Sequence, residues 1–365
     1  MKKLLILLLL TIILCPVASA YSGNVVEEQA DAIGTDKLEK TLPDSAGKLM
    51  GGLSVLESLD VDKGVGSIFS RAAAHVKEIL GAGIKSAVLI VLISLACSFT
   101  GAVAGTERTN FTVMTGTLAV SAVSVTSVAG FIGLGASTLD ELSTFSKMLL
   151  PTLTTAAVSS GAITSAAAKY AATAMFSDIL ITISKGLILP LIFAYVAASV
   201  AEAAIGGDAL SGAAGLMKWL AKTLLSITVS AFAAYLLLTG VITGASDAVA
   251  VRAAKMTLSA VLPVVGGIIA KASETILAGA AILKNAIGIF GLLAVSSICL
   301  IPFLRLGVNY LLYKLAGSIV SSIADAKITR LINAMSTAFG MILGMVGVSA
   351  LMLFISIISV IRVAV

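Results

Sequence analysis

The chain has 365 residues, of which 58% are hydrophobic and only 12% are charged, with a formal net charge of +5. Ordinary soluble domains carry about 25% charged residues and are less than half apolar, so a water-exposed globular domain is excluded because too few charges remain to cover its surface. Aromatic residues make up 5% of the chain, while glycine and alanine are abundant. The composition therefore predicts a membrane protein of closely packed helices rather than a transmembrane barrel.

Residues 1–20 have the pattern of a secretory signal peptide. Lysines precede a run rich in Leu and Ile, and the segment ends in Ala18-Ser19-Ala20. Small residues in this arrangement predict cleavage before Tyr21. The alternative is a short uncleaved anchor, although the apolar run is shorter than the roughly 20 residues that a membrane span needs.

Residues 21–83 form the polar part of the chain, with ten acidic and six basic residues. Apolar residues recur there at the spacing of short amphipathic helices, which we expect to be interrupted at Gly51-Gly52 and again at residues 64–66. Following a signal peptide, this segment is expected to lie outside the cytoplasm.

Residues 84–365 form a predicted multi-pass transmembrane region because apolar runs follow one another in series. The expected fold class is therefore all-α, a polytopic helical membrane protein with a small extracytoplasmic N-terminal helical segment. Another stretch, 306–324, is interrupted by Asn309 and Lys314 and is either a further span or an interfacial helix. The expected spans, about eight in number, are 84–104, 111–136, 148–168, 186–205, 223–245, 256–281, 286–304 and 335–361.

The distribution of Lys and Arg among the loops favours eight spans over seven. With the N-terminal segment outside, eight spans place nine basic residues inside and five outside, whereas seven spans without 256–281 place eight inside and seven outside. The basic residues stand singly between apolar runs, without the dense stripe and interleaved aromatics of a nucleic-acid-binding surface. Nucleic acid is therefore not an expected partner.

Several features inside the apolar runs are candidates for function. Proline removes a backbone donor and kinks a helix. Broken helices line substrate sites in some transporters, so prolines in the apolar runs are candidates for such a site. The alternative is that they produce simple packing kinks. Small-xxx-small patterns, which permit close helix approach, occur at Gly101/Gly105, Gly240/Gly244 and Gly340/Gly344. The candidate helix-breaking prolines are Pro151, Pro190, Pro263 and Pro302.

Lys271 and Glu274 are separated by three positions and would share one face of a helix, where they can form an ion pair. An unpaired charge is costly inside a bilayer. The pair therefore predicts either a polar lining within the membrane or an interfacial amphipathic helix.

Patterns for catalysis and metal binding are missing from the sequence. It contains no phosphate-binding loop, no His-Glu-x-x-His, no Gly-x-Ser-x-Gly and no Cys-x-x-Cys. Its cysteines, Cys15, Cys97 and Cys299, and its single histidine, His75, cannot build a disulfide framework or a Cys/His metal site. We therefore expect no enzyme activity and no cofactor.

Residues 244–319 resemble the stage III sporulation protein AE family of endospore-forming bacteria. The similar segments include Gly244-Ala-Ser-Asp247, Leu262-Pro263-Val-Val-Gly266-Gly267, Ile298-Cys299-Leu-Ile-Pro302 and Tyr313-Lys314-Leu-Ala. The polar positions that carry over as family-like residues, without an established chemical role, are Asp247, Arg252, Lys255, Lys284, Asn285 and Arg305.

The resemblance implies a multi-pass protein of the mother-cell membrane that surrounds the engulfed forespore. It implies a place in a channel or secretion-like complex with the other stage III A operon membrane proteins and with a forespore membrane protein across the intermembrane space. Such a complex would be required for endospore development after engulfment. A stand-alone secondary permease is the alternative that the proline-containing runs and the Lys271/Glu274 pair leave open.

Overall fold

The computed structural model of the protein describes residues 23–104, 106–205, 208–242 and 266–362. These residues form helices joined by short turns, with no strand among them, which confirms the expected all-α polytopic class. In chain order the elements are α2 (Gly23–Ile33), α3 (Thr35–Lys40), α4 (Asp44–Met50), the 3₁₀ turn η1 (Glu57–Leu59), α5 (Val61–Ala104), α6 (Thr106–Ser159), α7 (Ile163–Ile183), the π-helical turn η2 (Ser184–Ile188), α8 (Leu189–Ile205), α9 (Asp208–Ile242), α11 (Gly266–Val320) and α12 (Ala326–Ile361).

Long apolar helices make the chain a multi-pass membrane protein. Helices α6 and α11 contain 54 and 55 residues, so each is about 80 Å long. This length far exceeds the roughly 30 Å hydrocarbon core of a bilayer, and part of each helix must lie outside it. Within the described residues, five segments are long and apolar enough to cross a membrane: Val61–Gly101, Thr112–Ser159, Ala174–Ile205, Ile276–Val320 and Ala326–Ile361.

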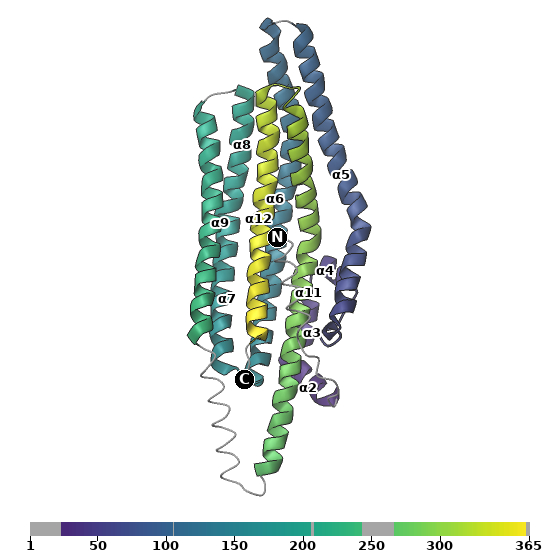
Figure 1. The fold of residues 1–365 in the computed structure, drawn as a ribbon, viewed down its shortest axis with the longest axis vertical. Coiled ribbons are helices and arrows are strands. Elements are labelled where there is room, and N and C mark those ends of the chain that lie inside the picture. The colour runs from purple at the N-terminus through teal and green to yellow at the C-terminus, as the bar shows by residue number, and fades with distance from the viewer. Residues whose placement is uncertain (1–22, 105, 206–207, 243–265, 363–365) are drawn as a thin grey trace.

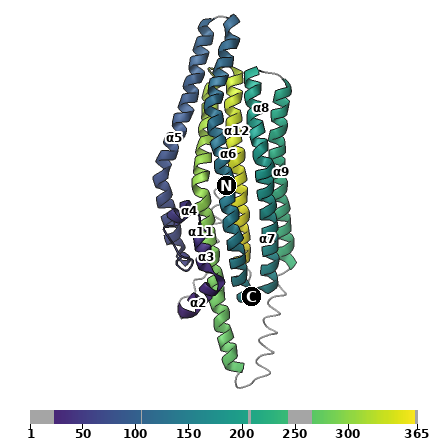
Figure 2. The same cartoon turned by 180° about the vertical axis from the view of Figure 1, so that it is seen from behind.

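The helices lie side by side in an elongated bundle (Figure 1). The tip where α5 meets α6 projects beyond the end at which α8, α9, α11 and α12 terminate. The N-terminal part of α11 projects in the opposite direction, and the view from behind shows the same two projections (Figure 2). The two ends of the bundle are therefore built from different helices.

Helices α11 and α12 form the centre of the bundle. Phe290 and Tyr313 of α11 and Phe339 of α12 are almost completely buried. The ring of Phe339 makes edge-to-face contacts with Tyr313 and with Phe131 of α6, at centroid distances of 4.9 and 5.1 Å. Each such pair stabilises packing by about 1 kcal/mol beyond the area that it buries, so this cluster joins three helices at one point.

The N-terminal segment packs on α11 and shares its core. Leu38 and Ala46 are fully buried in contact with the main hydrophobic cluster. The Ser58 hydroxyl donates to the Ala286 carbonyl at 3.0 Å, and the Gln29 amide donates to the carbonyl of Ile276 at 3.2 Å. These contacts fix the segment to the apolar body and do not leave it as an independent domain.

One of the two expected helix interruptions in this segment is confirmed. Gly51 and Gly52 have φ angles of 77° and 74° and end α4, because the left-handed region is open to glycine without strain. The interruption at residues 64–66 is wrong, since α5 continues from Val61 without a break. Gly64 serves close packing instead, because a Cβ atom there would lie 2.6 Å from the Leu293 side chain of α11.

Several expected spans do not form separate helices. Helix α6 contains all of 111–136 and runs on to Ser159. A turn at Ser160–Ala162, with Gly161 at φ 100°, divides the expected span 148–168 between α6 and α7. Helix α11 likewise contains 286–304 and most of 306–324. The polar residues that suggested loops are accommodated on helical surfaces, because charged side chains do not by themselves end a helix.

An ion pair further changes the expected topology. Lys185 of η2 lies 2.6 Å from the Asp140 carboxylate of α6. Eight spans would place residues 137–147 and 169–185 on opposite membrane faces. This direct contact places Asp140 and Lys185 at the same height in the bundle, so the two loops of the expected topology are replaced by neighbouring helical turns.

Candidate functional site

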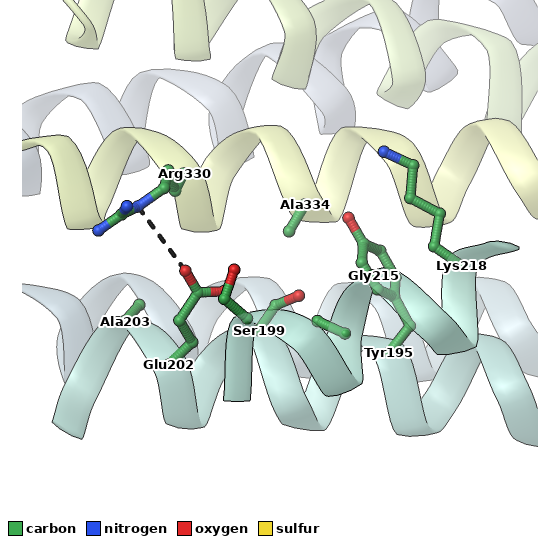
Figure 3. Close-up of a pocket in the computed structure, with 10 residues that line it drawn as sticks. Tyr195, Ser199, Glu202, Ala203, Gly215, Lys218, Arg330 and Ala334 are labelled. Carbon is green, nitrogen blue, oxygen red and sulfur yellow. Dashed lines mark ion pairs between the residues drawn. The ribbon is translucent and has the colours of Figure 1, made fainter. Parts of the chain in front are cut away.

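A polar cavity of about 200 Å³ lies where α8, α9 and α12 meet. Figure 3 shows the Glu202 carboxylate and the Arg330 guanidinium facing each other from α8 and α12. Tyr195 points from α8 toward α12, and Lys218 extends into the same space from α9. The cavity therefore collects charged and hydroxyl groups from three helices that are otherwise strongly apolar.

Helical periodicity accounts for this convergence. On α8, Tyr195, Ser199 and Glu202 are separated by four and then three residues, a spacing that places them on one face. Helix α12 contributes Arg330 and Ala334, again four residues apart. The small side chains that leave room between the helices are Ala203, Ala214, Gly215 and Ala334.

The charges in the cavity are unequally exposed. The Glu202 side chain is 18% exposed, that of Arg330 is 63% exposed, and the closest approach of the two groups is 3.9 Å. Lys218 adds a second cation at the cavity wall. Two cations thus accompany one carboxylate, and because Glu202 is less hydrated than Arg330 it depends more on a nearby opposite charge.

The arrangement offers groups that can bind a polar ligand. Hydroxyl groups of Ser199 and Thr337 lie beside that of Tyr195, so the cavity offers donors and acceptors for water or a small polar group. Across the part of the chain that the structure describes, no three His, Cys, Asp or Glu side chains lie close enough to hold a metal ion.

Pro151 lines a cavity of about 260 Å³, and a second predicted site residue that lines a cavity is Arg305. It is exposed on α11 and shares a groove of about 570 Å³ with Glu78 of α5 and with Asn309. The Asn309 amide donates to the Arg305 carbonyl at 2.9 Å. Arg305 and an acid from the N-terminal half therefore line the same groove, an arrangement that the spacing of the residues in the chain does not reveal.

Lys284 and Asn285 lie on α11 near the N-terminal segment. Lys284 is buried and Asn285 is half-buried. Their neighbour Ala286 accepts the hydrogen bond from Ser58. The structure thus places these family-like positions where the polar segment docks on α11.

The remaining predicted residues fall into separate groups. Lys271 and Glu274 lie in the first turns of α11, and the described side chains do not include theirs. Pro151 and Pro302 lie inside continuous helices, whereas Pro190 is the second residue of α8, which begins where the π-helical turn η2 ends. The predicted residues outside the described ranges are Asp247, Arg252, Lys255 and Pro263.

The sequence interpretation missed the residues that meet in the cavity of Figure 3. Glu202 did carry a signal, because it is the one charged residue in the expected span 186–205, and an ionisable residue inside a span is a candidate functional group. Lys218, Tyr195 and Arg330 carried no comparable signal. Their convergence depends on how α8, α9 and α12 pack.

Comparison with known proteins places this architecture in a family. The model of the family described as stage III sporulation protein AE matches residues 47–364, which is most of the chain. A segment of 168 residues is 23% identical to stage III sporulation protein AE of Bacillus subtilis (strain 168), covering 46% of this chain and 42% of that protein. This alignment therefore spans less than half the length of that relative. No solved structure matches the chain.

Proposed function

The chain belongs to the stage III sporulation protein AE family, so its general role is in sporulation. We propose that it is a membrane subunit of a channel or secretion-like complex between mother cell and forespore. The complex would be required for endospore development after engulfment. The observation that carries this proposal is the family match over residues 47–364, which begins within α4 and includes the apolar bundle that follows.

The structure supports a scaffold or pore-forming role for the chain. Its long helices project from both ends of the bundle (Figure 1), which gives it surfaces beyond the membrane for other subunits. The proposed partners are the other stage III A operon membrane proteins and a forespore membrane protein. In this arrangement the chain resides in the mother-cell membrane around the forespore with its N-terminal segment on the extracytoplasmic side.

Deletion of the gene in the sporulating host tests the proposed role. We expect arrest after engulfment, and complementation with the intact gene should restore spore formation. Normal spore yield from a clean deletion would contradict the proposal. Affinity purification of a tagged chain from sporulating cells, with a tagged unrelated membrane protein as control, should recover the proposed partner subunits.

A stand-alone secondary permease is the second candidate. The observation in its favour is the polar cavity of Glu202, Arg330 and Lys218 within an apolar bundle. Purified protein in liposomes would then transport a solute without partners, and alanine at both Lys271 and Glu274, or glutamine at Glu202, should abolish that flux while leaving protein levels intact. Flux that appears only with co-purified subunits favours the first function.

A further inference from the structure

A second cavity, of about 390 Å³, adjoins the one in Figure 3 and shares Lys218 with it. It lies between α9, α11 and α12. Lys218 and Lys222 line it from α9, separated by four residues and therefore on one helix face. The hydroxyl-bearing residues Tyr310 and Thr337 line it from α11 and α12.

The charge of this second cavity is positive. Its lining contains the two lysines and no acidic residue. Glu202, the carboxylate of the adjoining cavity, lies within 4 Å of Arg330, and no ion pair joins Lys218 or Lys222 to an acid among the described side chains. Two neighbouring ammonium groups repel each other, so a bound anion would stabilise this arrangement.

Glycine keeps the cavity open. Gly340 and Gly344 line it from α12 in place of larger side chains. A Cβ atom at Gly340 would lie 3.1 Å from the ring of Tyr310, so a side chain there would displace that ring. The small-xxx-small pattern thus allows the α12 backbone to approach the ring of Tyr310 closely at the cavity wall.

The position of the cavity along α9 identifies the source of the anion. Residues 223–242 directly after Lys222 belong to the expected span 223–245 and form a charge-free run of 20 residues, the length of a membrane span. The described part of α9 is not among the five segments named above, so this span is inferred from the sequence. Trp219, the single tryptophan of the chain, is 59% exposed beside the lysines, and Ile227 is 61% exposed in the following turns. Tryptophan and lysine at the end of an apolar run mark the membrane interface, where lipid headgroups lie.

We propose that Lys218 and Lys222, with Tyr310, bind the phosphate group of an anionic phospholipid in the cavity between α9, α11 and α12. The lysines supply charge, as basic residues do in lipid-headgroup pockets between transmembrane helices. Tyr310 lines the cavity beside the phosphate oxygens, and the acyl chains lie along α9 past the exposed Ile227. This site does not depend on the sporulation role.

Lipid binding by the full-length protein in detergent tests the proposal. Native mass spectrometry should show phosphatidylglycerol adducts at lower lipid concentration than phosphatidylcholine adducts. Replacing both lysines (Lys218→Gln with Lys222→Gln) should weaken phosphatidylglycerol binding on the order of tenfold. The matched control is Lys314→Gln, an exposed lysine of α11 outside the cavity lining, which should leave binding unchanged.

Two further measurements distinguish loss of charge from misfolding and a lipid from a soluble anion. The variant with Lys218→Arg and Lys222→Arg retains the charge and should retain phosphatidylglycerol binding, which separates charge from misfolding. Competition with inorganic phosphate at constant ionic strength distinguishes the source of the anion. Equal affinity for the two lipids, or a double glutamine variant that binds normally, would overturn the proposal. Displacement of the lipid by millimolar phosphate alone would overturn the lipid assignment in favour of a soluble anion.

Discussion

Helices α5 and α12 are similarly apolar, yet they meet very different surroundings. Phe99 of α5 is 75% exposed, whereas Phe339 of α12 is fully buried against α6 and α11. Apolar side chains exposed on α5 also include Leu92 and Val103. In a membrane protein both lipid and protein satisfy apolar surface, so hydropathy identifies helices that enter the membrane and does not identify the ones that form the core.

The largest difference is expected between aromatic truncations in the two helices. Phe339→Ala removes the ring at the junction of three helices and should lower the free energy of unfolding by about 3 kcal/mol, because it leaves a cavity. Phe99→Ala should change it by less than about 0.5 kcal/mol, as substitutions on an uncovered face do. Thermal unfolding in detergent measures both, and equal losses would contradict the assignment of α12 to the core.

Valine substitutions at two glycines of α6 test how closely α6 packs against α12. A Cβ atom at Gly135 would lie 2.6 Å from Ile342, whereas one at Gly130 would have nothing within 4 Å. Gly135→Val should therefore destabilise the protein by about 2 kcal/mol more than the matched variant Gly130→Val, because overpacking forces neighbours apart. The same unfolding assay measures the difference, and identical stabilities would indicate that the helices are further apart.

Removal of either partner of the Glu202–Arg330 pair should have unequal effects. Arg330→Gln leaves a largely buried carboxylate without its cation and should cost about 1 kcal/mol. Glu202→Gln leaves an arginine that is 63% exposed, so it should cost much less. Stability measurements on the two single variants test this order, and a larger loss in Glu202→Gln would show that Arg330 is the less hydrated partner.

The smallest effect concerns the turn that leads into α5. The Ser54 amide donates to the Glu57 carboxylate at 3.1 Å, and the Glu57 amide donates to the Ser54 hydroxyl at 3.3 Å. The hydrogen bonds with Ser54, followed by the charge of Lys63, lower the pKa of Glu57 below its ordinary value of 4.5. A group whose folded pKa is lowered stabilises the fold above its unfolded pKa, and this stabilisation is lost as pH falls through the folded value.

Hydrogen exchange of residues 54–60 therefore should increase as the pH is lowered below 4.5. Glu57→Gln, measured at the same pH values, corrects for the intrinsic pH dependence of exchange and should lack this additional increase. Parallel curves for the two proteins would show that Glu57 does not hold the turn that joins the N-terminal segment to α5.

Much of the fold could be predicted from local sequence. Apolar runs identified the helices that enter the membrane, and Gly51-Gly52 identified a true helix end. The prediction that 111–136 and 148–168 are separate spans was wrong. The charged residues between them, Asp140, Glu141 and Lys147, lower the local hydropathy, but α6 continues through them. Residues of this kind lower hydropathy without preventing helix formation, so hydropathy alone divides one long helix into two.

The candidate site was less accessible to prediction for a related reason. Arg305 was identified, but its cavity includes Glu78 from a distant part of the chain. Glu202, Lys218 and Arg330 come from three helices, and of these only Glu202 carries a signal of its own in the sequence. Helical periodicity fixes the face on which each residue lies, and it carries no information about which other helix that face meets.

The amino-acid sequence by itself determined the helical class, the membrane environment of the apolar runs and the family resemblance, because these properties depend on composition and short-range pattern. Only the tertiary structure decided that α6 and α11 are continuous, that Asp140 meets Lys185, and that α11 and α12 lie at the centre. These outcomes depend on contacts between residues far apart in the chain, where packing selects among faces that are equally apolar.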